Sequence, residues 1–182
     1  RKRASDLSRV GWIIFCKSTG FRITGSFWER SISATSYRAE LLGLCALHFL
    51  ARAVAEFYKL DGWTATLCCD NKRALEKSSN DRSRIRPSAK CADIRRSLRT
   101  TKPLLRGSFR YVHVYGHMDR LITWDQLTLT QQLNCVCDTL AKKLITSALT
   151  LGYHDRMTQL LPNEDVAMLI WGNKITGDIS SP

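Results

Sequence analysis

The sequence TATLCCDNKRALEK at residues 64–77 decides the fold, because an apolar strand gives way to a helix within it. Residues 64–69 are mostly β-branched or apolar and predict a buried strand, and residues 71–77 predict a short helix. Asp70 stands at the junction, at the carboxyl end of the expected strand. Sheets that are covered by helices bind their ligands at that edge. The stretch therefore predicts an α/β fold with Asp70 at its functional edge.

Other segments extend this pattern in both directions. The apolar run at 10–16 and the alternating run at 21–28 predict a hairpin, and Thr35 or Ser36 can cap a long buried helix over 37–58. Downstream, apolar spacing and chain breaks predict three more elements. They are a helix that Ser88 can cap and that ends near Thr100, a strand at 109–115, and a helix from about Leu133 to Leu149.

The order of these elements predicts a mixed β-sheet with helices on both faces. With 182 residues, of which 44% are hydrophobic, the chain is long enough for one globular core. We assign residues 1–150 to that domain and residues 151–182 to a C-terminal extension. Within the extension, the segments 166–171 and 174–179 have the pattern of a small β-hairpin.

The net charge of +12 indicates a polyanionic partner, for which nucleic acid is the default candidate. The positive charge is concentrated between residues 72 and 110, which favours phosphate binding over a merely solvated surface. The basic residues of this region are Lys72, Arg73, Lys77, Arg82, Arg84, Arg86, Lys90, Arg95, Arg96, Arg99, Lys102, Arg106 and Arg110. Charge alone does not separate DNA, RNA and anionic lipid. No apolar run approaches the roughly 20 residues of a membrane span, so we expect no membrane partner.

The cysteines are odd in number and form no CxxC pair, so a zinc site is not predicted. Most of them fall within apolar stretches, which is typical of reduced core cysteines in an intracellular protein, cytoplasmic or nuclear. They are Cys16, Cys45, Cys68, Cys69, Cys91, Cys135 and Cys137.

Four residues are candidates for chemistry: Glu40 in the first turn of the long helix, Asp70 at the strand end, His117 just past a strand, and Asp138 in an apolar helical face. Each has an ordinary alternative explanation. The helix dipole favours an acid such as Glu40, and Asp70 can cap the helix that follows it. Asp138 can pair with Lys142, and His117 can be a simple loop residue.

Taken together, these residues favour a metal site. Clustered carboxylates repel one another and persist mainly where divalent cations neutralise them. Oxygen ligands suit Mg²⁺ or Mn²⁺. Two such ions, a few ångström apart, can activate a water and stabilise the leaving oxygen in phosphodiester hydrolysis.

Four segments, in chain order, carry a resemblance to a known family. They are SYRAELL at 36–42, CDNKRAL at 69–75, VYGHMD at 114–119 and LNCVCDTLA at 133–141. Their order of Glu, Asp, His and Asp resembles that of type 1 ribonuclease H domains, over about residues 10–149. The segment 124–133 is most similar to the versions carried by reverse transcriptases of eukaryotic retroelements.

The resemblance implies a ribonuclease H-like fold and an endoribonuclease that cleaves the RNA strand of RNA–DNA hybrids with two Mg²⁺ or Mn²⁺ ions. It implies that Glu40, Asp70 and Asp138 are metal ligands, and that His117 assists product release or proton transfer. It also implies that basic and polar residues hold the hybrid backbone, with little dependence on sequence. The candidates are Asn71, Lys72, Arg73, Arg95, Arg96 and Arg99. A reverse transcriptase module of the same polyprotein is a further candidate partner.

The sequence departs from the family before the hairpin. The family's first strand ends in Asp-Gly-Ser or a similar motif, and its Asp bridges both metals. We interpret residues 1–9 as the loop after a lost first strand, and keep Asp6 as the minority alternative for the missing ligand. A lost strand predicts a collapse of activity, and it leaves sheet edges that must pair with something else or stay exposed.

Two functions therefore remain open: a metal-dependent hybrid endonuclease, and a catalytically incomplete, nucleic-acid-binding remnant of a retroelement polyprotein. A transposase or integrase of the same superfamily would place its Glu last, whereas Glu40 comes first here. A basic helical DNA-binding module is disfavoured by the three predicted strands at 10–16, 64–69 and 109–115.

Overall fold

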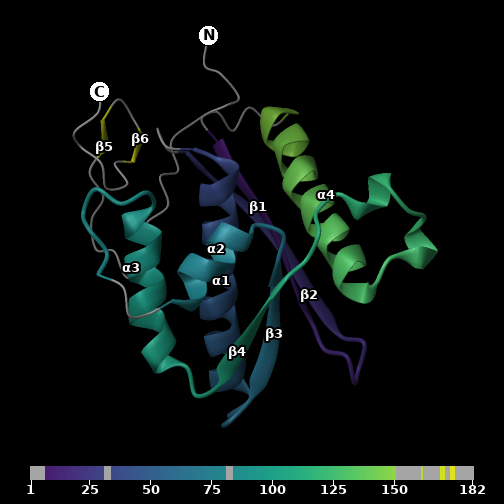
Figure 1. Ribbon diagram of the computed structural model, residues 1–182, viewed down its shortest axis with the longest axis horizontal. Helices are drawn as coiled ribbons and strands as arrows, with labels where there is room; N and C mark the ends of the chain where they lie inside the picture. The colour runs from purple at the N-terminus through teal and green to yellow at the C-terminus, as the bar shows by residue number, and fades with distance from the viewer. Residues whose placement is uncertain are drawn as a thin grey trace.

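The computed structural model describes residues 7–30, 34–80, 84–150, 161, 169–170 and 173–174. Figure 1 shows the arrangement of its helices and strands. In chain order they are β1 (Leu7–Phe15), β2 (Arg22–Arg30), α1 (Ser36–Phe57), β3 (Thr64–Cys69), α2 (Lys72–Ser79), α3 (Ala92–Thr101), β4 (Ser108–His113), α4 (Leu129–Thr150), β5 (Leu169–Ile170) and β6 (Asn173–Lys174). Short 3₁₀ turns lie at Lys102–Leu104, Met118–Arg120 and Trp124–Gln126. The chain is an α/β protein, as its sequence predicts.

Within the described residues the strands form three two-stranded sheets: β1 with β2 antiparallel, β3 with β4 parallel, and β5 with β6 antiparallel. Among these residues no backbone ladder joins the β1–β2 hairpin to the β3–β4 pair, so the single mixed sheet that we predicted is not found there.

The two larger sheets nevertheless lie against the same helices. Both β1 and β3 pack on α1 and on α4 (Figure 1). On β1, a Cβ added to Gly11 would lie 2.1 Å from the backbone oxygen of Cys137 on α4, whereas Val10 contacts Gly43 on α1. Neighbouring residues of a strand face opposite sides. The two helices therefore cover opposite faces of β1, which agrees with the prediction of helices on both faces.

The helix α1 forms the centre of the core. Thr35 caps its start, with its hydroxyl oxygen accepting a hydrogen bond from the backbone N–H of Arg38 at 3.1 Å. Its buried side chains include Leu41, Leu42 and Leu44, which belong to a core that also takes in residues of β1, β3, α2 and α3. The predicted long helix is confirmed, and it is buried mainly over its first half, whereas Phe57 and Tyr58 at its end are exposed.

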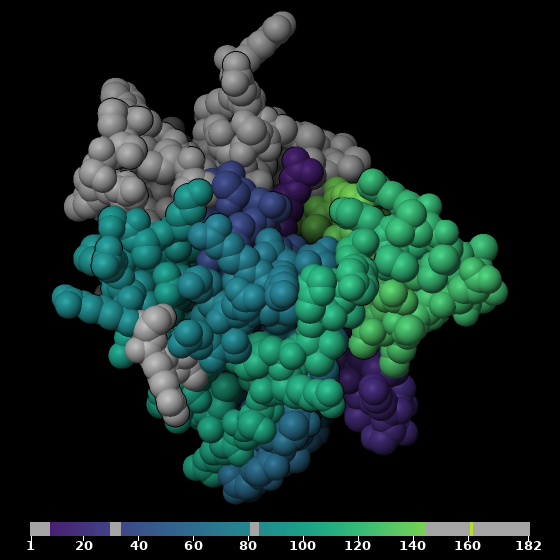
Figure 2. Space-filling view, in the orientation of Figure 1, coloured from purple at the N-terminus to yellow at the C-terminus, as the bar shows by residue number. Residues whose placement is uncertain are grey.

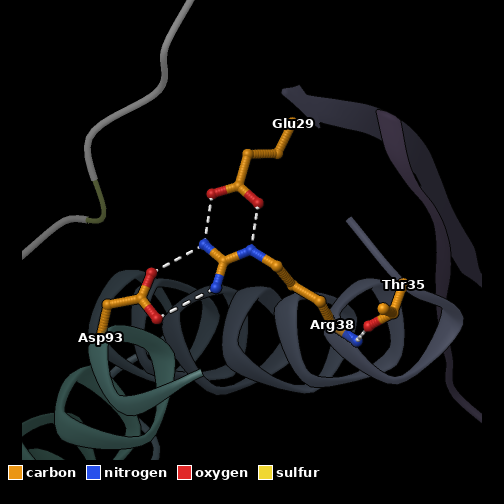
Figure 3. Close-up of polar contacts among 4 residues, drawn as sticks. All are labelled: Glu29, Thr35, Arg38 and Asp93. Atoms are coloured by element: carbon orange, nitrogen blue, oxygen red, sulfur yellow. Dashed lines mark hydrogen bonds and ion pairs between the residues drawn. The ribbon is translucent and has the colours of Figure 1, made fainter. Parts of the chain in front are cut away.

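A buried ion cluster ties α1 to its neighbours (Figure 3). The guanidinium of Arg38 is fully buried and donates two hydrogen bonds to Glu29 on β2, both 2.6 Å, and two to Asp93 on α3, at 2.7 and 3.0 Å. Paired, bidentate geometry of this kind is what makes a buried charge tolerable. The cluster therefore fixes the hairpin and α3 against the first turn of α1.

Several predicted boundaries change. The strand β1 begins at Leu7, so residues 7–9 belong to a strand and not to the loop that we predicted, because their backbone pairs with Trp28, Glu29 and Arg30. The helix α3 begins after Cys91, which has a left-handed backbone, and not after Ser88, because residues 88–91 form a turn.

The predicted C-terminal hairpin is present as the short pair β5–β6, and the rest of residues 151–182 lies outside the described residues apart from Leu161. Residues 1–6, including Asp6, also lie outside them.

None of the helices in the described ranges is both long enough and apolar enough to cross a membrane.

Candidate metal centre

Three predicted ligands come from three different elements that the fold brings together. Glu40 lies in the second turn of α1, Asp70 directly follows β3, and Asp138 lies on α4. β3 contacts both helices. The charges of Asp70 and Asp138 both raise the pKa of Glu40, so the three carboxylates lie in the same region of the molecule.

Glu40 and Asp70 form the inner part of the site together with a thiol. Ligand atoms of Glu40, Cys69 and Asp70 all lie within 4.8 Å of one another. The thiol of Cys69 donates a hydrogen bond to Oε2 of Glu40 at 3.2 Å. Burial, followed by the negative charge of Asp70 and more weakly that of Asp138, raises the pKa of Glu40 to about 7, although the hydrogen bond from Cys69 opposes the rise. The Glu40 carboxylate is therefore poorly solvated and lies near other negative charges.

Asp138 forms the outer part of the site with His117. Oδ2 of Asp138 lies 3.2 Å from Nδ1 of His117, and both side chains are partly accessible to solvent. Burial raises the pKa of Asp138, the neighbouring His117 opposes that rise, and the charge of Asp70 adds to it. His117 has a left-handed backbone, with φ of 55°, which directs the chain into the 3₁₀ turn that follows.

Asp70 contacts the same loop. A Cβ at Gly116 would lie 2.5 Å from Oδ2 of Asp70, so only glycine allows this approach without displacing the carboxylate. From β4, Nε2 of His113 donates a hydrogen bond to the backbone oxygen of Asp70 at 2.9 Å. The loop after β4 therefore contacts Asp70 through Gly116 and Asp138 through His117.

Two thiols in this site were missed by the sequence analysis. Cys69 contacts Glu40 directly, and burial and the charges of Glu40, Asp138 and Asp70 raise the pKa of Cys137 to about 12. Each of these cysteines immediately precedes a candidate ligand in the chain, Asp70 and Asp138 respectively, and that adjacency was the available signal. Both remain protonated thiols at neutral pH, so they add little negative charge.

The donor set fits a hard divalent cation. Three carboxylates offer oxygen ligands, which suit Mg²⁺ or Mn²⁺, and their mutual repulsion would be relieved by such a charge. Within the described residues, one compact group, Glu40 with Cys69 and Asp70, meets the geometry of a metal site. Asp138 couples electrostatically to Glu40 and Asp70 at the margin of that group, and it is the candidate ligand for a second ion.

The predicted nucleic-acid-binding residues differ in how available they are. Lys72, Arg96 and Arg99 are exposed, and Arg73 is exposed while its guanidinium stacks 5.4 Å from the centre of the Tyr37 ring. Arg95 is only half-accessible. The side chain of Asn71 caps α2 by accepting a hydrogen bond from the backbone N–H of Ala74, so its Oδ1 is already engaged.

The segments that carry these basic residues and the segment that carries Asp138 are visible on one face of the molecule (Figure 2). Figure 2 shows the teal segments of α2 and α3 over the left of one face and the green segment of α4 and its preceding loop over the right, with β4 between them.

Comparison of the chain with protein-family models, with curated proteins and with solved structures finds no match to any of them. A function must therefore be argued from the chemistry of the site.

Proposed function

We propose that this protein is a metal-dependent endoribonuclease that cleaves the RNA strand of RNA–DNA hybrids. The observation that carries the proposal is that Glu40 and Asp70 lie in one compact group, and that Asp138, beside His117, is close enough for its charge to raise the pKa of Glu40. Each acid has an ordinary explanation when taken alone, but those explanations do not require the acids to meet. A buried carboxylate with a raised pKa and acidic neighbours is typical of a functional site.

The proposed roles follow from the positions of the side chains. Glu40, Asp70 and Asp138 would hold two Mg²⁺ or Mn²⁺ ions, which supply an activated water and charge stabilisation at the phosphate when bound. Asp138 orients His117, whose exposed ring can accept or deliver a proton at the rim of the site. Gly116 keeps the Asp70 carboxylate in place by leaving room for it.

The substrate class is proposed from charge and geometry. The exposed cations Lys72, Arg73, Arg96 and Arg99 can contact phosphates along a nucleic-acid backbone, which gives affinity without sequence readout. Hybrid duplexes present 2′-hydroxyls in a wide minor groove, which proteins recognise largely by shape. The resemblance to type 1 ribonuclease H domains supports a hybrid over a DNA duplex as the substrate.

The decisive experiment measures cleavage of a labelled RNA–DNA hybrid by the full chain in Mg²⁺, with DNA duplex and single-stranded RNA of the same sequence as comparisons. Asp70→Asn keeps the shape of the side chain and removes its charge, so it should abolish cleavage while the protein stays folded. Asp61→Asn is the matched control, since Asp61 is an exposed acid paired only loosely with Arg106 at 3.6 Å. Cleavage that survives Asp70→Asn would refute the proposal.

One observation favours the second candidate, a binding protein with an incomplete site. Within the part of the chain that the structure describes, the β1–β2 hairpin and the β3–β4 pair are not joined into one sheet. A catalytically incomplete protein would bind the hybrid in a salt-sensitive manner without cutting it in either Mg²⁺ or Mn²⁺. That result would replace the nuclease proposal with the binding one.

A further inference from the structure

Cys69 is the member of the compact group that the proposed function does not use. Its thiol lies beside the Glu40 carboxylate and directly precedes Asp70, and ligand atoms of all three residues lie within 4.8 Å of one another. Thiolate sulfur is a soft donor that favours Zn²⁺, whereas Mg²⁺ prefers oxygen ligands alone. The thiol therefore changes which cation this group is expected to select.

The end of β3 brings two consecutive side chains to one place. Neighbouring residues within a strand point to opposite faces, but β3 ends at Cys69 and the chain bends at Asp70. Both side chains can therefore approach the same carboxylate, that of Glu40 on α1. In addition, the backbone N–H of Asn71 donates a hydrogen bond to Sγ of Cys69 at 3.3 Å. A donor directed at the sulfur stabilises the negative charge of a metal-bound thiolate.

The spacing of the donor atoms is close to that around a tetrahedral ion. Zn²⁺ binds sulfur at about 2.3 Å and carboxylate oxygen at about 2.0–2.2 Å, so it holds the two donors roughly 3.5 Å apart. Sγ of Cys69 already lies 3.2 Å from Oε2 of Glu40. The Asp70 carboxylate is within 4.8 Å of both ligand atoms, so a small rotation of its side chain brings it to that distance. Three protein ligands leave a fourth position open for water.

We infer that Glu40, Cys69 and Asp70 form a three-ligand site for Zn²⁺, in which the sulfur of Cys69 makes Zn²⁺ preferred over Mg²⁺. Binding forms a zinc–sulfur bond and releases the thiol proton to solvent, so it needs no further reactant. The chain has no CxxC pair, and the site exists only because α1 approaches the end of β3. One consequence rests on the proposed function: Zn²⁺ at this centre should displace Mg²⁺ and inhibit hybrid cleavage.

The test uses Co²⁺ as a spectroscopic substitute for Zn²⁺ in the full chain. All samples carry Cys16→Ser, because Cys16 is an exposed thiol that could bind the metal outside the site. We expect Co²⁺ to give the near-ultraviolet charge-transfer band of a cobalt–sulfur bond, and Zn²⁺ to remove that band. Cys69→Ser should abolish it, whereas the matched control Cys137→Ser, a half-buried thiol on α4 near the same carboxylates, should keep it. No band, or a band that survives Cys69→Ser, would overturn the inference.

Calorimetry then tests the preference itself. Cys69→Ser should weaken Zn²⁺ binding by about tenfold or more and change Mg²⁺ binding by less than about threefold, because only Zn²⁺ gains from sulfur. Equal losses for both ions would overturn the inference.

A second variant keeps the test decisive if Cys69→Ser does not fold. Asp70→Asn should then weaken Co²⁺ binding, measured by the same band, by about tenfold or more, and unchanged binding would overturn the inference. None of these measurements uses nucleic acid. A chain that shows the cobalt–sulfur band but does not cut the hybrid refutes the proposed function alone, and a chain that cuts the hybrid without showing the band refutes this inference alone.

Discussion

Replacing Glu40 with Gln should stabilise the protein at alkaline pH in the absence of metal. The fold raises the pKa of Glu40 from its ordinary value of 4.5 to about 7, first through burial and then through the charge of Asp70. A raised pKa means that the fold favours the protonated acid. The stability that Glu40 contributes is therefore fully present below about pH 4.5, and it is lost as the pH rises through about 7.

The size of the effect follows from that shift. Each pKa unit corresponds to about 1.4 kcal/mol, so ionised Glu40 costs the folded state roughly 3 kcal/mol at pH 8. Glutamine keeps the shape of the neutral acid at every pH. We expect Glu40→Gln to exceed the wild type by up to about 3 kcal/mol in free energy of unfolding at pH 8, and by less than about 1 kcal/mol at pH 5.

The assay is urea unfolding at pH 5 and pH 8 in EDTA, repeated with Mg²⁺. Glu56→Gln serves as the control, since Glu56 is an exposed acid on the same helix, paired with Arg52 at 2.6 Å. Mg²⁺ should stabilise the wild type more than Glu40→Gln, because the variant has lost a ligand. A Glu40→Gln variant that is destabilised at pH 8, or that gains equally at both pH values, would refute the account of a buried carboxylate repelled by its neighbours.

Three further outcomes are expected. Arg38→Met should lower the free energy of unfolding by about 3–5 kcal/mol in urea, because it leaves two buried carboxylates without their cation; a loss below 1 kcal/mol would contradict this. Gly116→Ala should weaken Mg²⁺ binding by about tenfold in calorimetry with little change in melting temperature, because its Cβ would displace Asp70; unchanged affinity would count against that contact. Cys16 is exposed, and hydrogen bonding, chiefly with Ser18, lowers its pKa to about 7, so mass spectrometry after brief iodoacetamide treatment at pH 7 should find it alkylated before the six other cysteines.

The elements with strong local signals could be predicted from the sequence alone. The strand at residues 64–69 is found with the predicted bounds, and α1 begins directly after Thr35, one of the two predicted caps. Local sequence features mark where these elements begin and end. The strand is a run of apolar and β-branched residues, and the helix follows a residue whose hydroxyl can cap it. The sequence also pointed to Glu40 and Asp70, two members of the compact group that the structure shows, but it did not point to the third member, Cys69.

The features that depend on long-range packing could not be predicted. Whether the β1–β2 hairpin and the parallel β3–β4 pair join into one sheet is decided by backbone pairing between segments that are far apart in the chain, and no local pattern encodes it. The start of α3 was misplaced because Cys91, a residue with no special preference for the left-handed region, adopts it here at φ of 54°. The thiols of Cys69 and Cys137 were assigned to the core, and burial alone gave no reason to link them to the carboxylates.

The candidate metal site joins three elements of the fold, because Glu40 lies on α1, Asp138 lies on α4 and Asp70 directly follows β3. Anything that favours the arrangement in which all three carboxylates are close together must strengthen cation binding. By thermodynamic linkage, a bound cation must favour that arrangement by the same factor.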